Sequence, residues 1–151
     1  YDKANRTSHE STRGVGLEQT MEDFLKMKAG MPDLKIITDV HSISEIETIM
    51  NNYNHAVDVF QIPAFLSRQT DIIQAAAMTG KTVNIKKGQW MAPWDVGPAI
   101  KKVTQFKKIR PKDSEVWITD RGTCFGYNNL VVDYTGLQYM LSNYNVPRKQ
   151  Q

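Results

Sequence analysis

The sequence predicts an α/β fold in which helices cover a parallel sheet. Four short runs of apolar, β-branched residues have the character of strands that are buried on both faces, and stretches with helical spacing of apolar residues separate them. Successive strand-like runs begin about 20 to 35 residues apart, which is the length of one strand–helix unit. This alternation is typical of parallel sheets.

The expected strands cover residues 35–39, 56–61, 82–86 and 115–119. The first expected helix covers residues 16–29, where Leu17, Met21 and Phe24 recur at helical spacing, and Gly30 and Pro32 follow it. The pattern predicts further helices over residues 43–53, 66–79 and 94–107. The third of these should end at Gly80, and the fourth should be interrupted by Gly97 and Pro98.

Charged or amide side chains stand at the end of each expected strand. They form the series Lys3, Asp39, Gln61, Lys86 and Arg121, in which Lys3 is taken as the end of a further strand. In parallel sheets, and in (β/α) barrels above all, ligands bind beyond the carboxyl ends of the strands. The series therefore indicates the active site of a barrel enzyme.

Composition narrows the class of protein. A length of 151 residues with 40% hydrophobic content is enough for one packed domain. The net charge of +3, without a basic face rich in aromatic residues, argues against nucleic acid as a partner. We find no apolar run of the roughly 20 residues that span a bilayer and no signal sequence, and therefore expect a cytoplasmic protein without a membrane partner. The single cysteine, Cys124, excludes an internal disulfide and a structural zinc site.

The chain yields fewer strands than a closed barrel requires. It begins at Tyr1 without an initiating Met and contains four complete strands, whereas an eight-stranded barrel typically needs about 250 residues. We therefore expect an incomplete barrel.

Several polar segments have both a functional and an ordinary interpretation. Residues 3–8 could form a phosphate cradle or a polar loop, and the two strand exits at residues 86–95 and 120–129 could bind phosphate or be solvated turns. Asp39 could accept hydrogen bonds from substrate hydroxyls or cap a helix. His41 is expected to be a hydrogen-bonded structural group rather than a base. Residues 79–82 lack the glycine spacing of a nucleotide-binding loop.

Taken in order, residues 3–8, 38–41, 61–71, 86–95 and 121–133 closely resemble the 3-deoxy-D-manno-octulosonate 8-phosphate synthase family. The resemblance implies a (β/α)8 TIM barrel that condenses phosphoenolpyruvate with D-arabinose 5-phosphate for lipopolysaccharide synthesis. Against that family this chain lacks the first strand and the last strands. It divides into a partial barrel over residues 1–137 and a divergent tail over residues 138–151.

The resemblance also assigns residues to phosphoenolpyruvate. It implies that Lys3 binds the carboxylate and that Gln61 faces the same substrate. It also implies that Lys86, Arg121 and the backbone amide of Ala64 bind the phosphate. A further active-site lysine of the family would lie five residues before Lys3, outside this chain.

A second group is implied for the sugar phosphate. Asn5 and Asp39 match residues that contact the pentose hydroxyls, and Arg6 and Thr7 match residues that bind its phosphate. Arg68 resembles an arginine that reaches the sugar phosphate of a neighbouring subunit, which implies a homo-oligomer.

No metal ligand or cofactor is expected within this chain. The histidine, glutamate and aspartate of metal-dependent members would lie outside it, although Gly88 resembles the metal-dependent branch, so a divalent metal is possible in a full-length parent. Two alternatives stay open. One is the sister synthase that uses erythrose 4-phosphate, which usually has proline at the position of Asn5, and the other is a non-catalytic anion-binding or assembly fragment.

Overall fold

The computed structural model describes residues 1–105 and 114–144, and a parallel sheet lies at its centre. The strands are β1 (Ile37–Asp39), β2 (Val59–Ile62), β3 (Thr82–Lys86) and β4 (Val116–Thr119). They lie in the order β1-β2-β3-β4, and all three neighbouring pairs are parallel. The expected parallel α/β arrangement is therefore confirmed. Because the strand order follows the chain order, the sheet has the sequential winding of a barrel wall.

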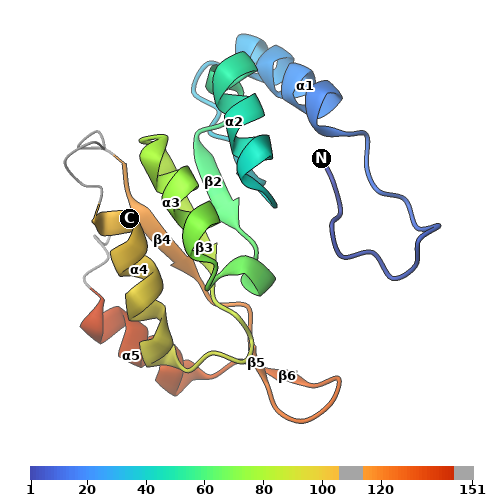
Figure 1. Ribbon diagram of the computed structural model, residues 1–151. Helices are drawn as coiled ribbons and strands as arrows, with labels where there is room; N and C mark the ends of the chain where they lie inside the picture. Colours follow the sequence, from blue (N-terminus) through green and yellow to red (C-terminus); the bar gives the residue numbers. More distant parts are fainter. Residues whose placement is uncertain (106–113, 145–151) are drawn as a thin grey trace.

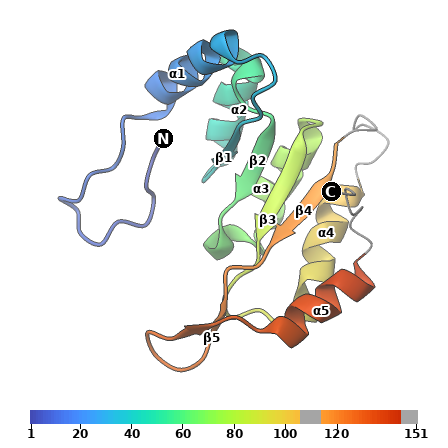
Figure 2. The ribbon, with the colours of Figure 1, turned by 180° about the vertical axis from the view of Figure 1, so that it is seen from behind.

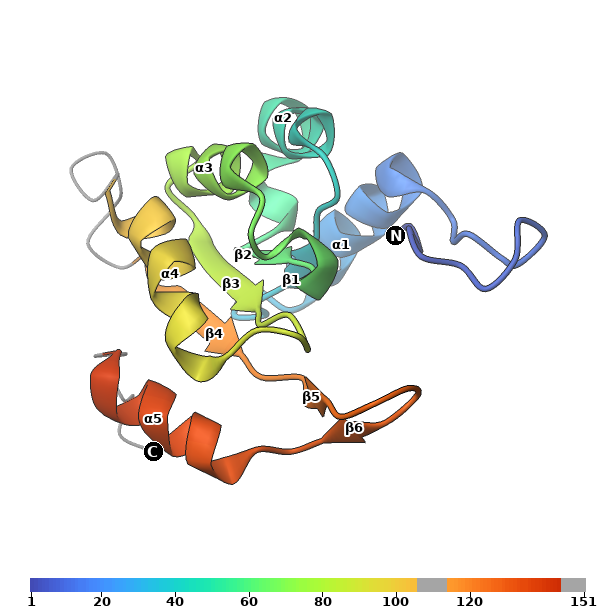
Figure 3. The ribbon, with the colours of Figure 1, turned by 60° about the horizontal axis from the view of Figure 1, so that its bottom comes forward.

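Helices lie along one face of this sheet (Figure 1 and Figure 3). Helices α2 (Ile43–Asn52), α3 (Thr70–Met78) and α4 (Val96–Thr104) follow β1, β2 and β3 in turn, and α1 (Leu17–Gly30) precedes β1. Within residues 1–105 and 114–144, no helix is both long enough and apolar enough to cross a bilayer.

The core lies between the sheet and these helices. The central strands turn Phe60, Ile62, Val83 and Ile85 toward the helices, and all four side chains are fully buried. Burying a side chain of this size contributes about 1.5 to 3 kcal/mol to folding. The apolar runs recognised in the sequence are thus the main source of stability.

The opposite face of the sheet is open. Figure 2 shows no helix in front of β2, β3 and β4 from this side. Ile37 is 43% exposed and Trp117 is 37% exposed on this face, because neighbouring residues of a strand point to opposite sides. Asp39, Gln61 and Asn84 share the same face through the strand register. In a closed barrel this surface would be the interior.

Two expected helices are shorter than predicted. The expected helix over residues 66–79 is wrong in its first part, because η2 (Ala64–Leu66) forms a separate turn and α3 begins only at Thr70. The expected helix over residues 94–107 starts as η3 (Pro93–Asp95) and continues as α4 from Val96. The expected interruption at Pro98 is absent from α4, because Pro98 lies in the first turn, where a backbone N–H has no helical acceptor. Residues 106 and 107 lie outside the described part.

A hairpin and a fifth helix follow the sheet, and the sequence did not predict either. Strands β5 (Thr123–Cys124) and β6 (Leu130–Val131) pair in antiparallel fashion, and α5 (Tyr134–Asn143) comes next. The Asp133 side chain caps α5 by accepting a hydrogen bond from Gly136 N at 3.1 Å. The helix runs through residue 137, the point at which we placed the start of the divergent tail.

Helix α5 packs on the start of α4. The rings of Trp94 and Tyr139 meet edge to face with their centroids 5.8 Å apart, and the Tyr144 hydroxyl donates to the Trp94 carbonyl at 2.8 Å. Gly97 leaves room for the Tyr144 ring, since a Cβ there would lie 3.0 Å from the hydroxyl oxygen. Residues up to 144 are therefore part of the folded unit.

The amino end of the sheet is held by charged side chains. Lys28 Nζ lies 2.6 Å from Asp58 Oδ2, and the same oxygen accepts a hydrogen bond from Ile36 N at 2.8 Å. Burial alone would raise the pKa of Asp58, but the Lys28 ammonium and the Ile36 N–H outweigh it and lower the pKa. Lys81 donates to the carbonyl of Val57 at 2.7 Å. Helix α1 and the starts of β1 and β2 are thereby joined.

Candidate active site

A chain of hydrogen bonds crosses the open face of the sheet. Thr119 Oγ1 donates to Asn84 Oδ1 at 2.9 Å, and Asn84 Nδ2 donates to Gln61 Oε1 at 2.7 Å. Gln61 Nε2 then donates to Asp39 Oδ1. All three bonds point from β4 toward β1 and end on the Asp39 carboxylate. Aligned hydrogen bonds polarise one another in a low dielectric, so the chain fixes both amides and directs donors at one carboxylate.

Lys86 adds a cation to the same edge. Its Nζ lies 3.3 Å from Asp39 Oδ2, and both side chains are about one third exposed. The pair is reachable from solvent, which a substrate-binding group must be. Asp39, Gln61 and Lys86 are thus brought together, as their positions at the strand ends predicted.

The next residue, Lys87, has the opposite environment. Only 2% of its surface is exposed, and its Nζ donates to the carbonyls of Gly88 and Met91, both at 3.2 Å. Asp120 Oδ1 lies 3.4 Å from the same nitrogen. Neighbouring lysines at this strand exit therefore point into different surroundings, one open and one enclosed.

The N-terminal arm, residues 1–16, folds back on itself, and its loop projects away from the sheet (Figure 1). Lys3 N donates to Arg13 O at 2.7 Å, and Gly16 N donates to Tyr1 O at 3.2 Å. Gly14 has φ +120° and its α-carbon packs against the Tyr1 carbonyl, where a side chain would collide. The arm forms a loop rather than the expected strand end at Lys3.

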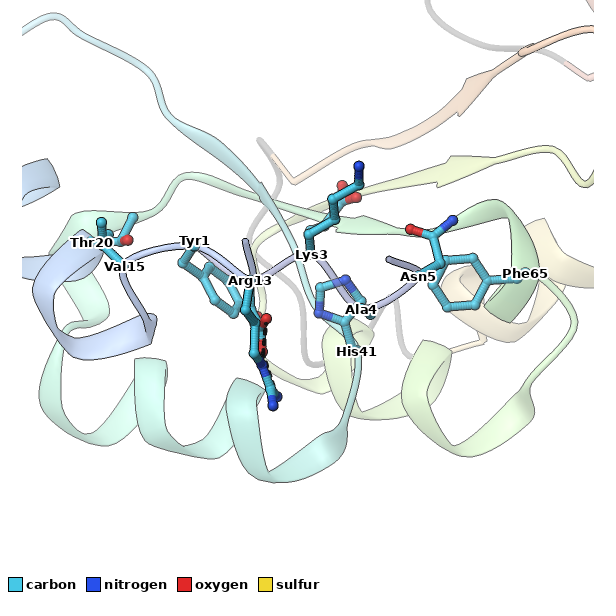
Figure 4. A pocket seen from close by; sticks show the side chains of 12 residues that line it. Tyr1, Lys3, Ala4, Asn5, Arg13, Val15, Thr20, His41 and Phe65 are labelled. Carbon is cyan, nitrogen blue, oxygen red and sulfur yellow. Dashed lines mark hydrogen bonds and ion pairs between the residues drawn. The ribbon is translucent and has the colours of Figure 1, made fainter. Parts of the chain in front are cut away.

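The arm and the end of β1 enclose a cleft of about 460 Å³. Lys3 and Asn5 line it from the arm, and His41 and Phe65 line it from the segments after β1 and β2 (Figure 4). Asp39, at the end of β1, lines the same cleft. The predicted residues Lys3, Asn5 and Asp39 therefore share one cavity, with a cation, an amide and a carboxylate facing it.

Glu45 supports the floor of this cleft. Its Oε2 accepts hydrogen bonds from the Tyr1 hydroxyl at 2.6 Å and from His41 N at 2.7 Å. Burial alone would raise the pKa of Glu45, but the His41 ring, the Tyr1 hydroxyl and the His41 N–H outweigh it and lower the pKa to about 2. Burial and the Glu45 carboxylate raise the pKa of Tyr1.

His41 is held by its neighbours. Its ring stacks on Phe65 with centroids 6.3 Å apart, and its Nδ1 lies 3.4 Å from Glu45 Oε2. This nitrogen is buried without a hydrogen-bond partner. The ring is packed between Phe65 and Tyr1 rather than hydrogen-bonded through Nδ1, so the expected hydrogen bond of this ring nitrogen is absent.

The other arm residues lie around the cleft. Arg6 Nη1 donates to the carbonyls of His9 at 2.7 Å and Ser11 at 3.1 Å, so the guanidinium shapes its own loop. It also lines a smaller cleft of about 200 Å³ beside Lys3. Thr7 is exposed on the same loop.

The remaining predicted residues lie farther along the strand ends. Ala64 is buried at the start of η2, directly beyond β2. Arg121 is exposed two residues after β4, and Arg68 lines a separate cleft with Asp95 and Lys102. The Arg68 cleft is distinct from the cleft at Asp39.

Sequence reasoning missed three polar residues that the structure connects to this region, Glu45, Asn84 and Thr119, and it missed the pairing of Lys87 with Asp120. Alternation along β3 was the available signal for Asn84, because it lies two residues before Lys86 and must share its face. The same alternation places Lys86 and Lys87 on opposite faces. Nothing in the sequence indicated that Asp120 is the partner of Lys87.

Within residues 1–105 and 114–144, no group of three or more His, Cys, Asp or Glu side chains could share a metal ion.

Comparison with known proteins places these features in context. The sequence model of the DAHP synthetase I family matches residues 1–147. A Rickettsia prowazekii protein named 2-dehydro-3-deoxyphosphooctonate aldolase is 50% identical over 148 residues, which cover 97% of this chain and 50% of that protein. A Bartonella bacilliformis protein of the same name is 49% identical over 144 residues, covering 94% of this chain and 47% of that protein. The chain spans about half the length of the curated relatives it matches.

Proposed function

The chain belongs to the DAHP synthetase I family, and on that premise we propose that it carries part of the active site of a 3-deoxy-D-manno-octulosonate 8-phosphate synthase. The reaction condenses phosphoenolpyruvate with D-arabinose 5-phosphate and releases phosphate. The name shared by the relatives supports the eight-carbon product. The observation that carries the proposal is the pairing of Lys86 with Asp39 at the carboxyl ends of the strands.

We assign Lys86 and Arg121 to the phosphate of phosphoenolpyruvate, together with the backbone amide of Ala64. Lys3 is assigned to its carboxylate, and Gln61 faces the same substrate. Lys86 is about one third exposed and Arg121 is exposed beyond β4, so both cations can meet a soluble anion. An arginine suits a phosphate because its planar fork of donors matches two oxygens at once.

We assign Asn5 and Asp39 to the hydroxyls of the sugar, and Arg6 and Thr7 to its phosphate. Asn5 and Asp39 line the same cleft, which supports a shared ligand. Arg68 lines a separate cleft. We assign it to the sugar phosphate in the active site of a neighbouring subunit, which requires a homo-oligomer.

The residues of this chain would act mainly by positioning. Both substrates are anions, so fixed cations in a cleft offset their repulsion and align the reacting carbons. Carbon 3 of phosphoenolpyruvate forms a bond to the aldehyde carbon of the sugar, which leaves an oxocarbenium-like centre at carbon 2. The aldehyde oxygen takes up a proton and becomes a hydroxyl. Water adds to carbon 2 and gives up a proton, and the phosphate leaves with its bridging oxygen. Asn84 donates to Gln61, and Gln61 donates to Asp39 and orients its carboxylate.

The sister reaction with erythrose 4-phosphate is the second candidate, because the family is named for a DAHP synthetase. Asn5 disfavours it, since the sister enzyme usually has proline there. A non-catalytic anion-binding fragment is the third.

A turnover assay distinguishes these three candidate functions. The test uses the complete protein, meaning this chain with any sequence that its gene adds on either side. We expect phosphate release from phosphoenolpyruvate to depend on arabinose 5-phosphate and to be lost in Lys86→Ala, while the exposed control Lys26→Ala retains it. Turnover with erythrose 4-phosphate alone would support the sister enzyme. Phosphoenolpyruvate binding without turnover would support the anion-binding role.

A further inference from the structure

The two candidate phosphate ligands each adjoin one member of an enclosed ion pair. Lys86 precedes Lys87 in the chain, and Arg121 follows Asp120. Lys87 Nζ and Asp120 Oδ1 lie 3.4 Å apart, and their side chains are 2% and 12% exposed. A lysine is almost never this buried unless it is paired, because removing its charge from water is costly.

The Lys87 ammonium is surrounded by two carbonyl acceptors and one carboxylate. Two carbonyls of the loop after β3, those of Gly88 and Met91, accept from it, and the carboxylate of the loop after β4 completes its surroundings. One ammonium therefore holds the shape of its own loop and also holds the neighbouring loop.

Asp120 stabilises the loop after β4, as Lys87 stabilises the loop after β3. Its Oδ2 accepts a hydrogen bond from Gly122 N at 3.2 Å, and Gly122 has φ +91°, a left-handed turn that favours glycine. Arg121 lies between these two residues. The carboxylate thus fixes the turn that carries the Arg121 side chain.

Two backbone hydrogen bonds flank the ion pair and join the same loops. Lys87 N donates to Thr119 O at 2.8 Å, and Cys124 N donates to Gln89 O at 2.9 Å. Because side chains alternate along the strand, Lys87 points away from the open face on which Lys86 meets Asp39. Lys87 can therefore act on a ligand at that face only through its neighbours.

We propose that Lys87 and Asp120 are a positioning pair that fixes the spacing of Lys86 and Arg121 for the phosphate of phosphoenolpyruvate. The inference rests on the proposed function of that site. Lys86 and Arg121 are like charges that repel each other when no anion is bound, so their loops need a link that holds them together in the empty site. A preset pair of cations stabilises a phosphate better than one that must assemble on binding.

The test compares Lys87→Met and Asp120→Asn with the matched control Lys26→Met, which removes the lysine of an exposed ion pair with Asp23. Asp120→Asn keeps the side-chain shape and the acceptor for Gly122. It therefore tests the loss of the ion pair even if Lys87→Met fails to fold. Two readouts are taken on the complete protein. One is hydrogen exchange at the Cys124 N–H, which joins the loops, and the other is the KM for each substrate.

We expect exchange at Cys124 to accelerate by about tenfold or more in both variants, since local opening exposes that bond. The KM for phosphoenolpyruvate should rise by about tenfold, whereas the KM for the sugar phosphate should change less than about twofold. The double variant Lys87→Met/Asp120→Asn should be no worse than the poorer single variant, because one interaction is lost in each case.

Unchanged exchange at Cys124 would overturn the proposal, as would a fall in kcat with both KM values unaltered. If the wild-type protein does not use phosphoenolpyruvate, the proposed function fails, and the exchange measurement still decides whether the pair holds the loops together.

Discussion

The ammonium of Lys86 on β3 lies 3.3 Å from the Asp39 carboxylate on β1, and this ion pair passes over the strand between them. Gln61 on that intervening strand donates to the same carboxylate. Asp39 is therefore shared by a cation and an amide when no ligand is bound. An anion that approaches Lys86 would therefore have to compete with the Asp39 carboxylate for the ammonium.

Arg121→Ala should reduce kcat/KM for phosphoenolpyruvate in the complete protein with little effect on folding. The side chain is exposed beyond β4, so the core does not depend on it. Loss of a charge-assisted contact to the phosphate should cost roughly 2 to 4 kcal/mol of transition-state stabilisation. Steady-state kinetics and thermal unfolding measure the two effects, and Lys101→Ala on α4 is the matched control. Unaltered kinetics would remove Arg121 from the site.

Asn5→Ala should weaken the preference for arabinose 5-phosphate over erythrose 4-phosphate. The amide lines the cleft with Asp39, where it can hydrogen-bond a sugar hydroxyl. An unmade bond of this kind costs roughly 1 to 3 kcal/mol. The ratio of kcat/KM values for the two sugars is the measurement. A wild-type protein that favours the four-carbon sugar would contradict the assignment.

Asn84→Leu should destabilise the fold. The substitution leaves Gln61 Oε1 and the Thr119 hydroxyl without their partner on β3. Leaving a buried polar group unpaired costs about 1 to 3 kcal/mol, and because Gln61 and Thr119 are only half-buried we expect a total of about 1 to 3 kcal/mol. Denaturant unfolding gives the change in free energy, with Asn51→Leu on the exposed side of α2 as the control. Equal effects of the two substitutions would show that the hydrogen-bond chain contributes little.

Glu45 should make stability depend on pH in acid. Its pKa is lowered from 4.5 to about 2 in the folded protein, so its contribution is complete above about 4.5 and is lost as the pH falls through about 2. The difference in Tm between wild type and Glu45→Gln should be constant above this window and shrink within it. Glu47→Gln, exposed on the same helix, should show no such convergence. A pH-independent difference would indicate that Glu45 acts through shape alone.

The 151-residue chain by itself should have negligible synthase activity. Ile37 and Trp117 are exposed on the open face, and the outer edges of β1 and β4 carry unpaired backbone groups in the described part of the chain. Exposed apolar faces and free strand edges promote association. Size-exclusion chromatography and a turnover assay on the monomer peak check this. Robust turnover by purified monomer would refute it.

The sequence predicted the sheet well because β-branched residues bounded by glycine and proline leave few alternatives. It also identified Asp39, Gln61 and Lys86 from their places at strand ends, and the structure brings these three together. The predicted start of helix α3 was too early in the chain, because apolar residues such as Leu66 belong to the short turn before the helix.

The features that the sequence did not predict depend on contacts between residues far apart in the chain. The link between Lys87 and Asp120 joins residues 33 positions apart, and it depends on the closeness of two loops that only the folded sheet creates. Helix α5 was missed because its contacts with Trp94 join residues even farther apart in the chain, as Trp94 and Tyr139 do. Local patterns predict elements, whereas partners between elements follow from the three-dimensional arrangement.

The charged cluster at the amino end of the sheet has an evolutionary consequence. Asp58, Lys28 and Lys81 secure the starts of the strands, while the residues assigned to substrates stand at the opposite ends. The residues assigned to the sugar and this scaffold cluster are therefore different positions, so selection can change one set while the other is inherited unchanged. Asn84 is an exception at the opposite end, because its hydrogen bonds also stabilise the sheet there.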